Sequence, residues 1–411
     1  MKKPKIRFNG YTEDWEHRKL GDLMNVTSVK RIHQSDWTNS GVRFLRARDI
    51  VAESKNEEVT EPLFISQEKY DEYSAISGKV KKGDLLVTGV GTIGVPMLIN
   101  NEEPIYFKDG NIIWFKNENV IDGKFFYYSF VGDIIQKFIK ESAGTGTVGT
   151  YTIDSGRKTP IILPVQKEEQ SQIGRYFSEL DNLITLHQRK CEETKKLKKY
   201  MLQKMFPQNG KNVPEIRFSG FTDVWEQRKL GDIASRVQGN DGRMELPTLT
   251  ISAANGWMDQ EDRFSGNIAG KEQSNYTLLH KGELSYNHGN SKLAKYGTVF
   301  ALRTYEEALV PRVYHSFKID NGNADFIEYY FATKIPDREL GKLITSGARM
   351  DGLLNIGFDS FMGIEITVPT LKEQEKISEF FRELDNLITL HQRKCDELQN
   401  LKKFMLQNMF V

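Results

Sequence analysis

The sequence predicts a mixed α/β protein in which two globular α/β domains are joined by two long helices that form an antiparallel coiled coil, with a pseudo-twofold internal repeat. Three observations support this prediction. Two blocks of sequence occur twice, one at the start and one at the end of each half. The second block has the residue spacing of a long helix. Between the blocks, short β-branched and aromatic runs alternate with glycine, which is typical of mixed α/β domains.

The first repeated block opens each half of the chain. Residues 4–23 and 214–233 are identical at 13 of 20 positions, and both contain the string Arg-Lys-Leu-Gly-Asp. A repeat of this kind indicates the architecture before any local assignment is made. The two blocks therefore mark the starts of two equivalent halves.

The second repeated block is helical by its periodicity. Residues 179–191 and 383–395 are the same string, ELDNLITLHQRKC. A mostly apolar set of positions, spaced alternately four and three apart, runs through each copy and forms the seam that faces a partner helix. The seam positions are Ile173, Phe177, Leu180, Ile184, His187, Cys191, Thr194, Lys198, Met201 and Met205 in the first half, and Ile377, Phe381, Leu384, Ile388, His391, Cys395, Leu398, Lys402, Met405 and Met409 in the second.

Prolines mark the ends of these helices. Pro164 and Pro369 stand just upstream, where a helix start is expected, and Pro207 ends the first helix. Each helix then has about 35 to 40 residues, or roughly 50–60 Å at 1.5 Å per residue. A helix of that length with one apolar seam is not stable alone, so we expect the two helices to pack on each other.

The middle segments of the two halves share no comparable string. Strand-like runs occur at residues 84–88, 112–115 and 363–368, and helical patterns at residues 125–140 and 325–344. The turn-rich stretch 206–214 separates the halves. The predicted organisation is a first globular domain at 1–160, a first helix at 161–207, a linker at 208–214, a second globular domain at 215–367 and a second helix at 368–411.

Composition limits the classes of function. Lys and Arg number 57 against 56 Asp and Glu, a net charge of +1, so any anion-binding surface must be regional. The two cysteines, Cys191 and Cys395, exclude a disulfide scaffold and a cysteine-rich zinc module. The first residues lack the apolar segment of a signal peptide, and the most apolar stretch, 85–99, is too short and too interrupted to span a bilayer. We expect a cytoplasmic protein.

Two glycine patterns, at residues 89–94 and 144–149, match G-x-G-x-x-G. A dinucleotide-binding fingerprint must follow a strand and open a helix that receives the pyrophosphate. A strand-like run follows Gly94, and we predict no helix after Gly149. We therefore interpret both patterns as loops whose backbone comes close to another group.

No catalytic constellation is found. None of the 12 prolines is followed by another, which excludes the Asn-Pro-Pro-aromatic or Asp-Pro-Pro-aromatic motif of amino-methyltransferases, and there is no Walker A sequence. Pro336, Asp337, Glu339 and Lys342 resemble part of a nuclease motif but fall on one predicted helix. The histidines in the seam are interpreted as a polar register device ahead of metal ligands, and the cysteines as small core residues.

Polar and basic loop residues occur in both middle segments. Small polar residues mixed with isolated Lys and Arg can supply contacts to base edges and phosphates, although solvated loops also have this composition. The candidates for DNA binding are Arg43, Arg46, Arg48, Thr88, Thr92, Thr145, Thr147, Tyr151, Arg157 and Lys158 in the first domain, and Asn287, His288, Asn290, Ser291, Lys292, Lys295, Arg312 and Arg349 in the second.

This order of parts resembles the specificity (S, HsdS) subunit of type I restriction-modification systems over essentially the full length. The Trp-Glu-x-Arg-Lys-Leu-Gly-Asp strings at 15–22 and 225–232, and the proline-to-glutamate openings of the helices at 164–173 and 369–377, are similar to the pattern of that family. The resemblance implies that each globular domain is a target-recognition domain for one half of an asymmetric bipartite site in double-stranded DNA. It implies that the helices set the spacer between the halves and dock two modification (methyltransferase) subunits.

The resemblance also implies that the chain has no catalytic activity or cofactor of its own. S-adenosylmethionine, ATP and Mg would be used by the modification subunits and by the restriction/translocase subunits of the full complex. The family varies its recognition domains freely, so contact residues do not carry over by motif.

The two helices are identical even at positions that we expect to face outward, so packing on each other does not account for the whole match. An antiparallel pair presents the same outer face twice, which suits two copies of one partner. The candidate docking residues are Asp181, Gln188, Arg189, Asp385, Gln392 and Arg393.

Two alternatives remain open. A structural coiled-coil adaptor would bind other proteins through its globular domains, and it would lack the steep salt dependence of DNA binding. A dinucleotide enzyme would use the glycine loops, and a cofactor-binding assay would detect it.

Overall fold

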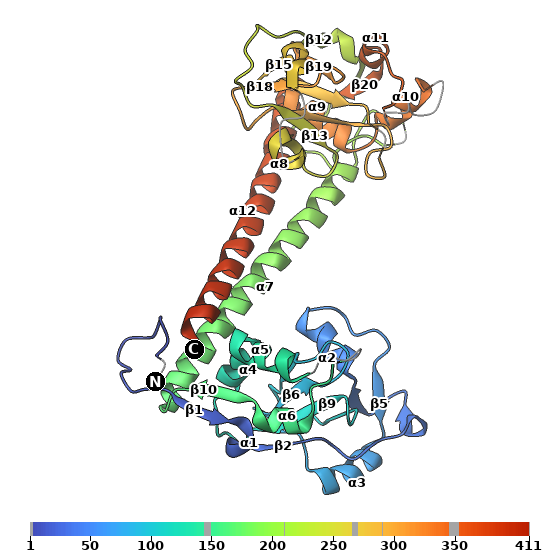
Figure 1. Ribbon diagram of the computed structural model, residues 1–411. Helices are drawn as coiled ribbons and strands as arrows, with labels where there is room; N and C mark the ends of the chain where they lie inside the picture. The colour runs from blue at the N-terminus through green and yellow to red at the C-terminus, as the bar shows by residue number, and fades with distance from the viewer. Residues whose placement is uncertain are drawn as a thin grey trace. The chain divides into compact units, whose positions relative to one another are not determined.

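The computed structural model describes residues 3–143, 149–208, 210–264, 270–289, 291–344 and 353–410. The chain divides into two compact units, one made of residues 1–188 and 392–411 and the other of residues 189–391. Each unit therefore contains one globular domain together with parts of both long helices, α7 and α12 (Figure 1).

The first unit is built on a central antiparallel sheet in the order β2-β9-β6-β7. Its strands are β2 (Asn25–Thr27), β9 (Ile112–Lys116), β6 (Leu85–Thr88) and β7 (Pro96–Leu98). A second sheet has the order β3-β5-β4-β8, in which β4 and β8 are parallel. Its strands are β3 (Trp37–Thr38), β5 (Leu63–Ile65), β4 (Val42–Leu45) and β8 (Ile105–Phe107). The central sheet packs with residues of both long helices in one hydrophobic core. The second sheet forms a separate core with α2 and α3.

The remaining elements of the first unit surround these sheets. They are β1 (Glu16–Lys19), paired with β10 (Pro160–Leu163), a 3-10 turn η1 (Gln34–Asp36), and the helices α1 (Leu20–Leu23), α2 (Ala47–Ser54), α3 (Gln67–Ser77), α4 (Gly123–Val131), α5 (Asp133–Ser142) and α6 (Ile153–Lys158). The β1–β10 pair joins the first repeated block to the strand that leads into the first long helix.

The second unit has a central sheet of equivalent strand order, built from a different amino-acid sequence. The order is β12-β19-β16-β17, again antiparallel, with β12 (Ala234–Arg236), β19 (His315–Ile319), β16 (Leu284–Asn287) and β17 (Thr298–Ala301). In both sheets the first strand pairs with the last, and the last pairs with a hairpin. The two middle segments therefore share a topology that their sequences do not reveal.

Among the other elements of the second unit, the β11–β20 pair matches the β1–β10 pair of the first unit, and the remaining sheets differ. They are β11 (Glu226–Lys229), paired with β20 (Glu365–Val368), the two-stranded sheets β13 (Leu249–Ser252) with β14 (Gly256–Asp259) and β15 (Thr277–His280) with β18 (Glu307–Val310), the 3-10 turns η2 (Leu230–Asp232) and η3 (Gly270–Asn275), and the helices α8 (Gln260–Phe264), α9 (Ala324–Ala332), α10 (Asp337–Lys342) and α11 (Phe358–Met362).

The two long helices are α7 (Lys167–Lys204, 38 residues) and α12 (Leu371–Met409, 39 residues). Every predicted seam position on both helices is buried or half-buried, so the predicted seam is confirmed. Within each unit the helices run antiparallel in the same register. Lys402 Nζ lies 2.6 Å from Asp181 Oδ1 in the first unit, and Lys198 Nζ lies 2.5 Å from Asp385 Oδ1 in the second.

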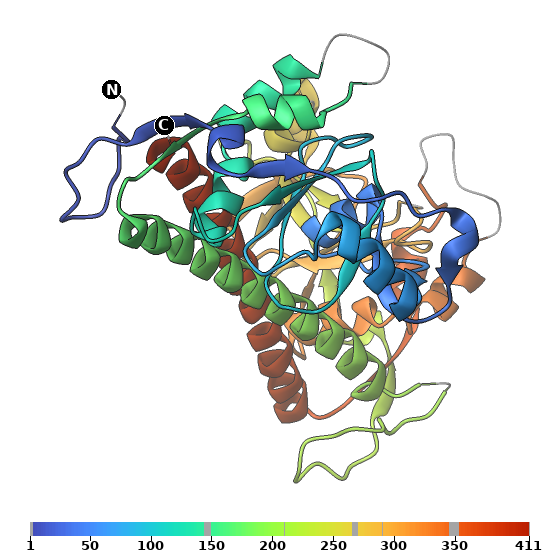
Figure 2. The same ribbon diagram turned by 90° about the horizontal axis from the view of Figure 1, so that it is seen from below.

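The repeated blocks hold each globular domain to its helix through equivalent contacts. Arg7 donates two hydrogen bonds to Glu169 on α7, and Arg217 donates two to Glu373 on α12. The segment that carries Arg7 lies beside the last turn of α12, where the Ile6 N–H donates to the Asn408 carbonyl at 3.0 Å (Figure 2). The sequence repeats are therefore structural anchors.

Three local expectations need correction or refinement. The helical patterns at 125–140 and 325–344 each form two helices, α4 with α5 and α9 with α10. The first break lies at Gly132 in an extended conformation, and the second at Lys334, whose φ of 67° cannot continue a helix. The expectation of no helix after Gly149 is wrong, because α6 follows it. The Thr152 side chain caps this helix by accepting from the Ser155 N–H.

No helix among the described residues has both the length and the apolar character that crossing a membrane requires.

Candidate nucleic-acid interface

The hairpin loop between β6 and β7 is tied to the segment that precedes α6. The Gly89 N–H donates to the Asn111 carbonyl, and the Gly89 carbonyl accepts from the Tyr151 N–H at 2.9 Å. A Cβ at Gly89 would lie 2.7 Å from the Tyr151 carbonyl oxygen, so only glycine fits. The interpretation of this glycine pattern as a close backbone approach is confirmed at Gly89. Thr92 is exposed in this loop.

The equivalent hairpin loop of the second domain, between β16 and β17, is tied in the same way. The Leu354 N–H donates to the His288 carbonyl at 2.8 Å, which corresponds to the Tyr151–Gly89 bond of the first domain. The Asn287 side chain accepts from the Gly289 N–H and donates to the Ile251 carbonyl. Each domain thus brings a hairpin loop against the segment that follows its helices.

Several predicted contact residues of the second domain lie on this hairpin loop. Ser291 forms a tight turn with Ala294, whose N–H donates to both the hydroxyl and the carbonyl of Ser291. The turn leaves Lys292 and Lys295 exposed, together with Leu293, which is 67% exposed. The exposed Arg312 is next to Val313, whose carbonyl lies 2.9 Å from His288 Nε2. Lys292 and Lys295 therefore lie on the hairpin loop, and Arg312 adjoins a residue whose carbonyl is close to His288 of that loop.

Four predicted contact residues lie outside the described part of the chain: Thr145, Thr147, Asn290 and Arg349.

Three predicted contact residues are buried, and this argues against their direct contact with DNA. Thr88 is fully buried, and its hydroxyl donates to the Thr92 carbonyl and accepts from the Val95 N–H. Tyr151 is also buried, and its hydroxyl is 2.5 Å from Thr159 Oγ1. His288 is 5% exposed. In each case the polar group is used by the fold, so these residues shape the loops.

Of the three arginines near the start of α2, Arg43 lies on β4 of the second sheet, Arg46 is the N-cap of α2 and Arg48 is in its first turn. Arg46 makes two hydrogen bonds to the buried Asp49 and one to the Glu61 carbonyl. Arg43 donates to the Leu63 carbonyl, and burial lowers the pKa of its guanidinium. Only Arg48 of these three is largely exposed. The sequence could not separate cations that hold the fold from cations that face solvent.

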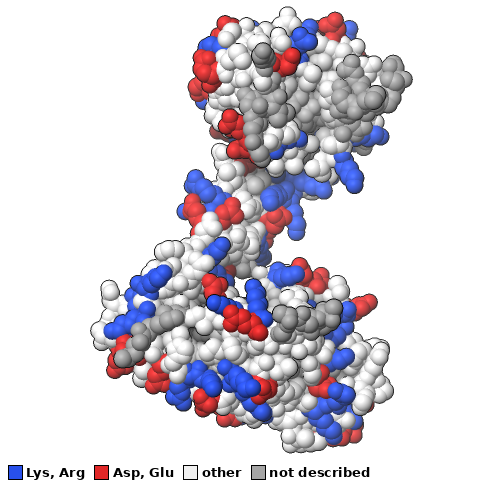
Figure 3. Space-filling model, in the orientation of Figure 1, with Lys and Arg blue, Asp and Glu red and all other residues white. Residues whose placement is uncertain are grey.

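Arg157 and Lys158 are exposed on α6. Lys158 pairs with Asp154 one turn earlier at 2.7 Å, an exposed pair that contributes little to stability. On the face drawn in Figure 3, Lys and Arg side chains are mixed with Asp and Glu over both units. The mixture of both signs on this face agrees with the net charge of +1.

The candidate docking residues on the helices fall into two groups. Asp181 and Asp385 were expected to face outward, and this is wrong, because they accept hydrogen bonds from Tyr128 and Tyr329 of the globular domains. The other four are exposed. Arg189 and Arg393 pair with Glu193 and Glu397 on their own helices, and Gln392 donates to Asp396.

The helix surfaces carry an apolar feature that was not predicted from the sequence. Apart from Leu371 at the first position of α12, each long helix carries four large apolar side chains that are more than one-third exposed, and the two sets occupy equivalent positions of the repeat. We call these sets the outer apolar stripes: Leu183, Leu186, Leu197 and Tyr200 on α7, and Leu387, Leu390, Leu401 and Phe404 on α12. At 100° per residue, each set lies on one side of its helix, roughly opposite the side that bears Asp181 or Asp385. A second apolar period beside the seam is the signal that could have found them.

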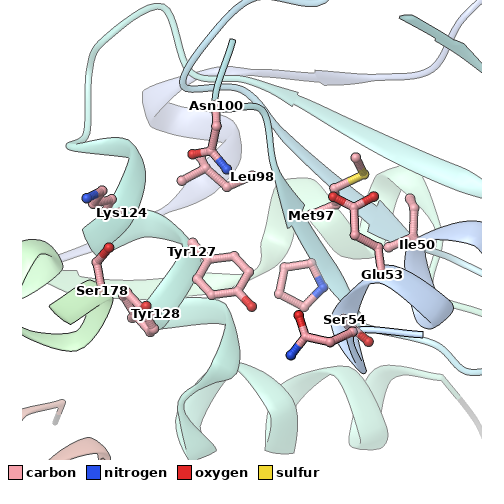
Figure 4. A pocket seen from close by; sticks show the side chains of 12 residues that line it. Ile50, Glu53, Ser54, Met97, Leu98, Asn100, Lys124, Tyr127, Tyr128 and Ser178 are labelled. Carbon is pink, nitrogen blue, oxygen red and sulfur yellow. The ribbon is translucent and has the colours of Figure 1, made fainter. Parts of the chain in front are cut away.

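The first unit also contains a cavity of about 270 Å³ between α2, β7, α4 and α7 (Figure 4). Glu53, Tyr127 and Lys124 line it, and burial raises the pKa of the Glu53 carboxyl. Among the residues that the structure describes, no predicted DNA-binding residue lines this cavity. Among the described residues, no group of three or more His, Cys, Asp and Glu side chains is placed to hold a metal ion.

Comparison with known families places this architecture. Residues 12–196 and 222–400 match the type I restriction modification DNA specificity domain, once in each half of the chain. The chain belongs to this family. The two matches cover both hairpin loops, most of both long helices and the β1–β10 and β11–β20 pairs.

Curated relatives of the chain carry corresponding names. A putative type I restriction enzyme specificity subunit of Haemophilus influenzae is 32% identical over 169 residues, which are 41% of this chain and 40% of that protein. The MjaVIII specificity subunit of Methanocaldococcus jannaschii is 26% identical over 203 residues, which are 46% of this chain and 45% of that protein. The chain thus spans less than half of the length of these two relatives.

A solved structure shares the fold. The crystal structure of the S subunit of a type I restriction-modification system from M. genitalium superposes with a TM-score of 0.59 at 14% sequence identity, covering 100% of this chain and 99% of that one. The prediction of a mixed α/β fold with two globular domains and a long helix pair is confirmed.

Proposed function

We propose that the chain is the DNA sequence-recognition subunit of a type I restriction-modification complex. Each recognition domain, in residues 1–160 and 215–367, reads one half of an asymmetric bipartite site in double-stranded DNA. One observation carries the proposal: the middle segments of the two domains share no comparable sequence string, yet each forms a sheet of the same strand order with a tied hairpin loop, and each is held by a repeated anchor. A repeated support with two different loops suits two different half-sites.

The exposed residues of these loops have the chemistry that DNA recognition needs. In the second domain, Lys292 and Lys295 are exposed on a loop that also contains Asn, Gly and Ser, and the exposed Arg312 adjoins Val313, whose carbonyl is close to His288 of that loop, so cations for phosphates accompany small polar groups for base edges. In the first domain, Thr92 is on the loop, and Arg157 and Lys158 are on α6, which follows the tied segment. We propose that these exposed residues contact DNA.

The long helices would set the spacer between the half-sites and dock two modification subunits. The outer apolar stripes support this docking, because exposed Leu, Tyr and Phe side chains at equivalent repeat positions offer the same surface twice. Arg189 and Arg393, which lie next to the stripes around each helix, would form the polar part of the same surfaces. Gln188 and Gln392, seven positions after Asp181 and Asp385, lie on the side of those aspartates and would be separate docking contacts.

The chemistry of the complex would belong to its partners. In this proposal, S-adenosylmethionine serves the modification subunits, ATP and Mg serve the restriction/translocase subunits, and this chain contributes no catalytic residue. The complex would act on DNA in the cytoplasm.

The alternative function, a coiled-coil adaptor that binds proteins through both globular domains, requires no DNA. Binding to the target sequence that falls steeply with rising salt would exclude it, because counterions are released only when cations neutralise phosphates.

The decisive experiment maps methylated adenines in DNA from cells that express this chain with its partner subunits. We expect one bipartite motif. Replacing residues 15–160 by the corresponding segment of a relative should change one half of the motif, and replacing residues 225–367 should change the other. If replacing one segment changed both halves of the motif, the assignment of one half-site to each domain would be wrong.

A further inference from the structure

The cavity of the first unit has an equivalent place in the second unit, which the repeated architecture identifies. Tyr128 on α4 and Tyr329 on α9 each donate to an aspartate of a long helix. The two helices therefore align, and Tyr127, which lines the cavity, stands at the position of Glu328.

The central hairpins align through their backbone hydrogen bonds. The Ile99 N–H donates to the residue that precedes β6, and the Leu302 N–H donates to the residue that precedes β16. Asn100, which also lines the cavity, therefore stands at the position of Arg303.

Arginine side chains occupy this place in the second unit. Arg303 Nη2 lies 2.6 Å from Asp325 Oδ1, and its Nη1 lies 2.9 Å from Glu328 Oε2. Arg382 on α12 reaches the other oxygen of Asp325 at 3.4 Å. The residue of α7 that corresponds to Arg382 is Ser178, which precedes the same repeated string.

The first unit has shorter side chains at both arginine positions. Asn100 and Ser178 line the cavity of about 270 Å³. The cavity thus corresponds to the space that guanidinium groups fill in the second unit.

Acceptor groups without a partner line this cavity. Glu53 on α2 and Tyr127 on α4 both face it (Figure 4). Among the described residues, neither side chain forms a hydrogen bond or an ion pair. Glu53 is in the last turn of α2, where the helix dipole disfavours a negative charge, and burial raises the pKa of its carboxyl. A cation in the cavity would stabilise this carboxylate.

Two cations of the chain lie in this region, and neither pairs with Glu53. Arg43 acts on Glu53 only through its charge, because its guanidinium donates to the Leu63 carbonyl. Lys124 is exposed, and Figure 4 shows it and Glu53 on opposite sides of the cavity. The carboxylate is therefore available to a cation from outside the chain.

We propose that this cavity binds a small organic cation, whose guanidinium or alkylammonium group takes the place that Arg303 has in the second unit. Glu53 supplies the negative charge, the Tyr127 hydroxyl and the Asn100 amide oxygen accept hydrogen bonds, and Ile50 and Met97 contact the alkyl part. The cavity is smaller than the roughly 300–1,000 Å³ of sites for drug-sized ligands, so the ligand is small. The inference goes beyond DNA recognition and does not depend on it.

The first test uses agmatine, which carries a guanidinium and an ammonium group. Titration calorimetry of the full-length chain at low salt should give a Kd of about 1 mM or lower. Butylurea, which is of similar size and uncharged, should not bind at the same concentrations. A chain that does not bind agmatine would overturn the proposal.

Charge variants then locate the agmatine. Glu53→Gln should weaken binding about tenfold or more, the effect of removing one hydrogen bond to a charged group. The matched control is Glu57→Gln, an exposed acid just after α2 that does not line the cavity, and it should leave binding unchanged. Lys124→Gln should strengthen binding about twofold, because it removes a nearby like charge. Weaker binding in Lys124→Gln would show that the cavity selects an anion.

The second test needs no ligand and introduces the arginine of the second unit. Asn100→Arg should abolish agmatine binding and raise the midpoint of thermal unfolding by about 2–4 °C, because its guanidinium can pair with Glu53. Adding Glu53→Gln should remove this gain. Undiminished agmatine binding in Asn100→Arg would show that the cavity is not the place of a guanidinium group. If Asn100→Arg does not fold, the agmatine titrations of Glu53→Gln still decide.

The cation has two sources, a free amine or guanidine and a side chain of a modification subunit, and assembly distinguishes them. If Glu53→Gln assembles with modification subunits as well as the unaltered chain does, the ligand is a free cation. If assembly weakens about tenfold while Glu57→Gln assembles normally, an arginine or lysine of that subunit occupies the cavity. Only this comparison rests on the proposed function, and the agmatine titrations decide without it.

Discussion

A buried carboxylate on each long helix shows how far the two halves are equivalent at the level of single residues. Glu169 accepts two hydrogen bonds from Arg7 and one from Trp15 Nε1 at 3.3 Å. Glu373 accepts two from Arg217, while Trp225 Nε1 donates to no acceptor among the described residues. A buried charge is tolerated only when it is paired, so the second carboxylate depends more on its arginine.

Arg217→Met and Arg7→Met test this difference. Arg217→Met should lower the free energy of unfolding by about 3–5 kcal/mol, the usual cost of leaving a buried charge without its partner. Arg7→Met should cost less, because Trp15 still donates to Glu169. Urea unfolding followed by circular dichroism at pH 7 measures both. Equal losses, or a larger loss for Arg7→Met, would show that the tryptophan bond does not matter.

His315 should make the free energy of unfolding of the second unit depend on pH. Burial lowers its pKa from 6.5 to about 4, so the unfolded chain binds a proton between these values and the folded chain does not. The free energy of unfolding should therefore fall as pH drops from about 6.5 to 4, by up to about 3 kcal/mol. His315→Phe should flatten this part of the profile, although it also loses the bond to Ile356. Urea unfolding at four or five pH values measures the slope, and an unchanged slope in the variant would assign the effect to another group.

At the level of elements, periodicity and repeats predicted the long helices, whereas the strand order of the sheets could not be predicted. The seam follows directly from residue spacing because a helix that packs along its whole length must keep one apolar side. The common sheet order of the two domains has no such signal, since it depends on pairing between distant strands of unlike sequence. The breaks at Gly132 and Lys334 depend on backbone conformations that an apolar pattern does not reveal.

The candidate site residues could be predicted only in part, because their contacts also depend on the fold. Composition finds cations and small polar residues in loops, but it cannot tell which of them already have partners. Arg46 is held by Asp49 three positions away, whereas Lys292 is presented by the Ser291 turn. Asp181 looks like an outward position on a helical wheel, and only the packing of α4 against α7 reveals that Tyr128 uses it.

The outer apolar stripes should carry the docking of modification subunits. Leu186→Asp together with Leu390→Asp should weaken assembly at least tenfold, because a charge in an apolar interface loses its hydration. Folding should change little, since both side chains are exposed in the chain itself. Native mass spectrometry of the complex and urea unfolding of the chain measure the two effects.

A matched control places the same charges elsewhere on the helices. Thr185→Asp with Thr389→Asp alters exposed residues one position earlier, about 100° around each helix, and assembly should persist. Complexes that form equally well with the leucine variants would remove the stripes from the interface.

At the scale of the whole molecule, the chain passes between its two units twice, once within α7 and once within α12. Each globular core therefore takes residues from both helices. Phe177 of α7 and Met409 of α12 belong to the core of the first unit, whereas Phe381 of α12 belongs to the core of the second and Met201 of α7 packs against it. The register is the same in both units, as the Lys402–Asp181 and Lys198–Asp385 pairs indicate. An alteration placed at both crossing points leaves all of these contacts unchanged.

Four-residue insertions after Gln188 and after His391 use these crossing points to test whether the helices set the spacer. Four residues lengthen an α-helix by about 6 Å and add slightly more than one turn, which disturbs the seam only mildly. Since a base pair of DNA rises about 3.4 Å, the spacer of the methylated motif should lengthen by about one to three base pairs, with both half-sites unchanged. Methylation mapping measures the motif, and an insertion in one helix alone should reduce methylation because the registers no longer match. A doubly inserted chain that assembles and still methylates the original spacing would show that another part of the complex fixes the distance between the half-sites.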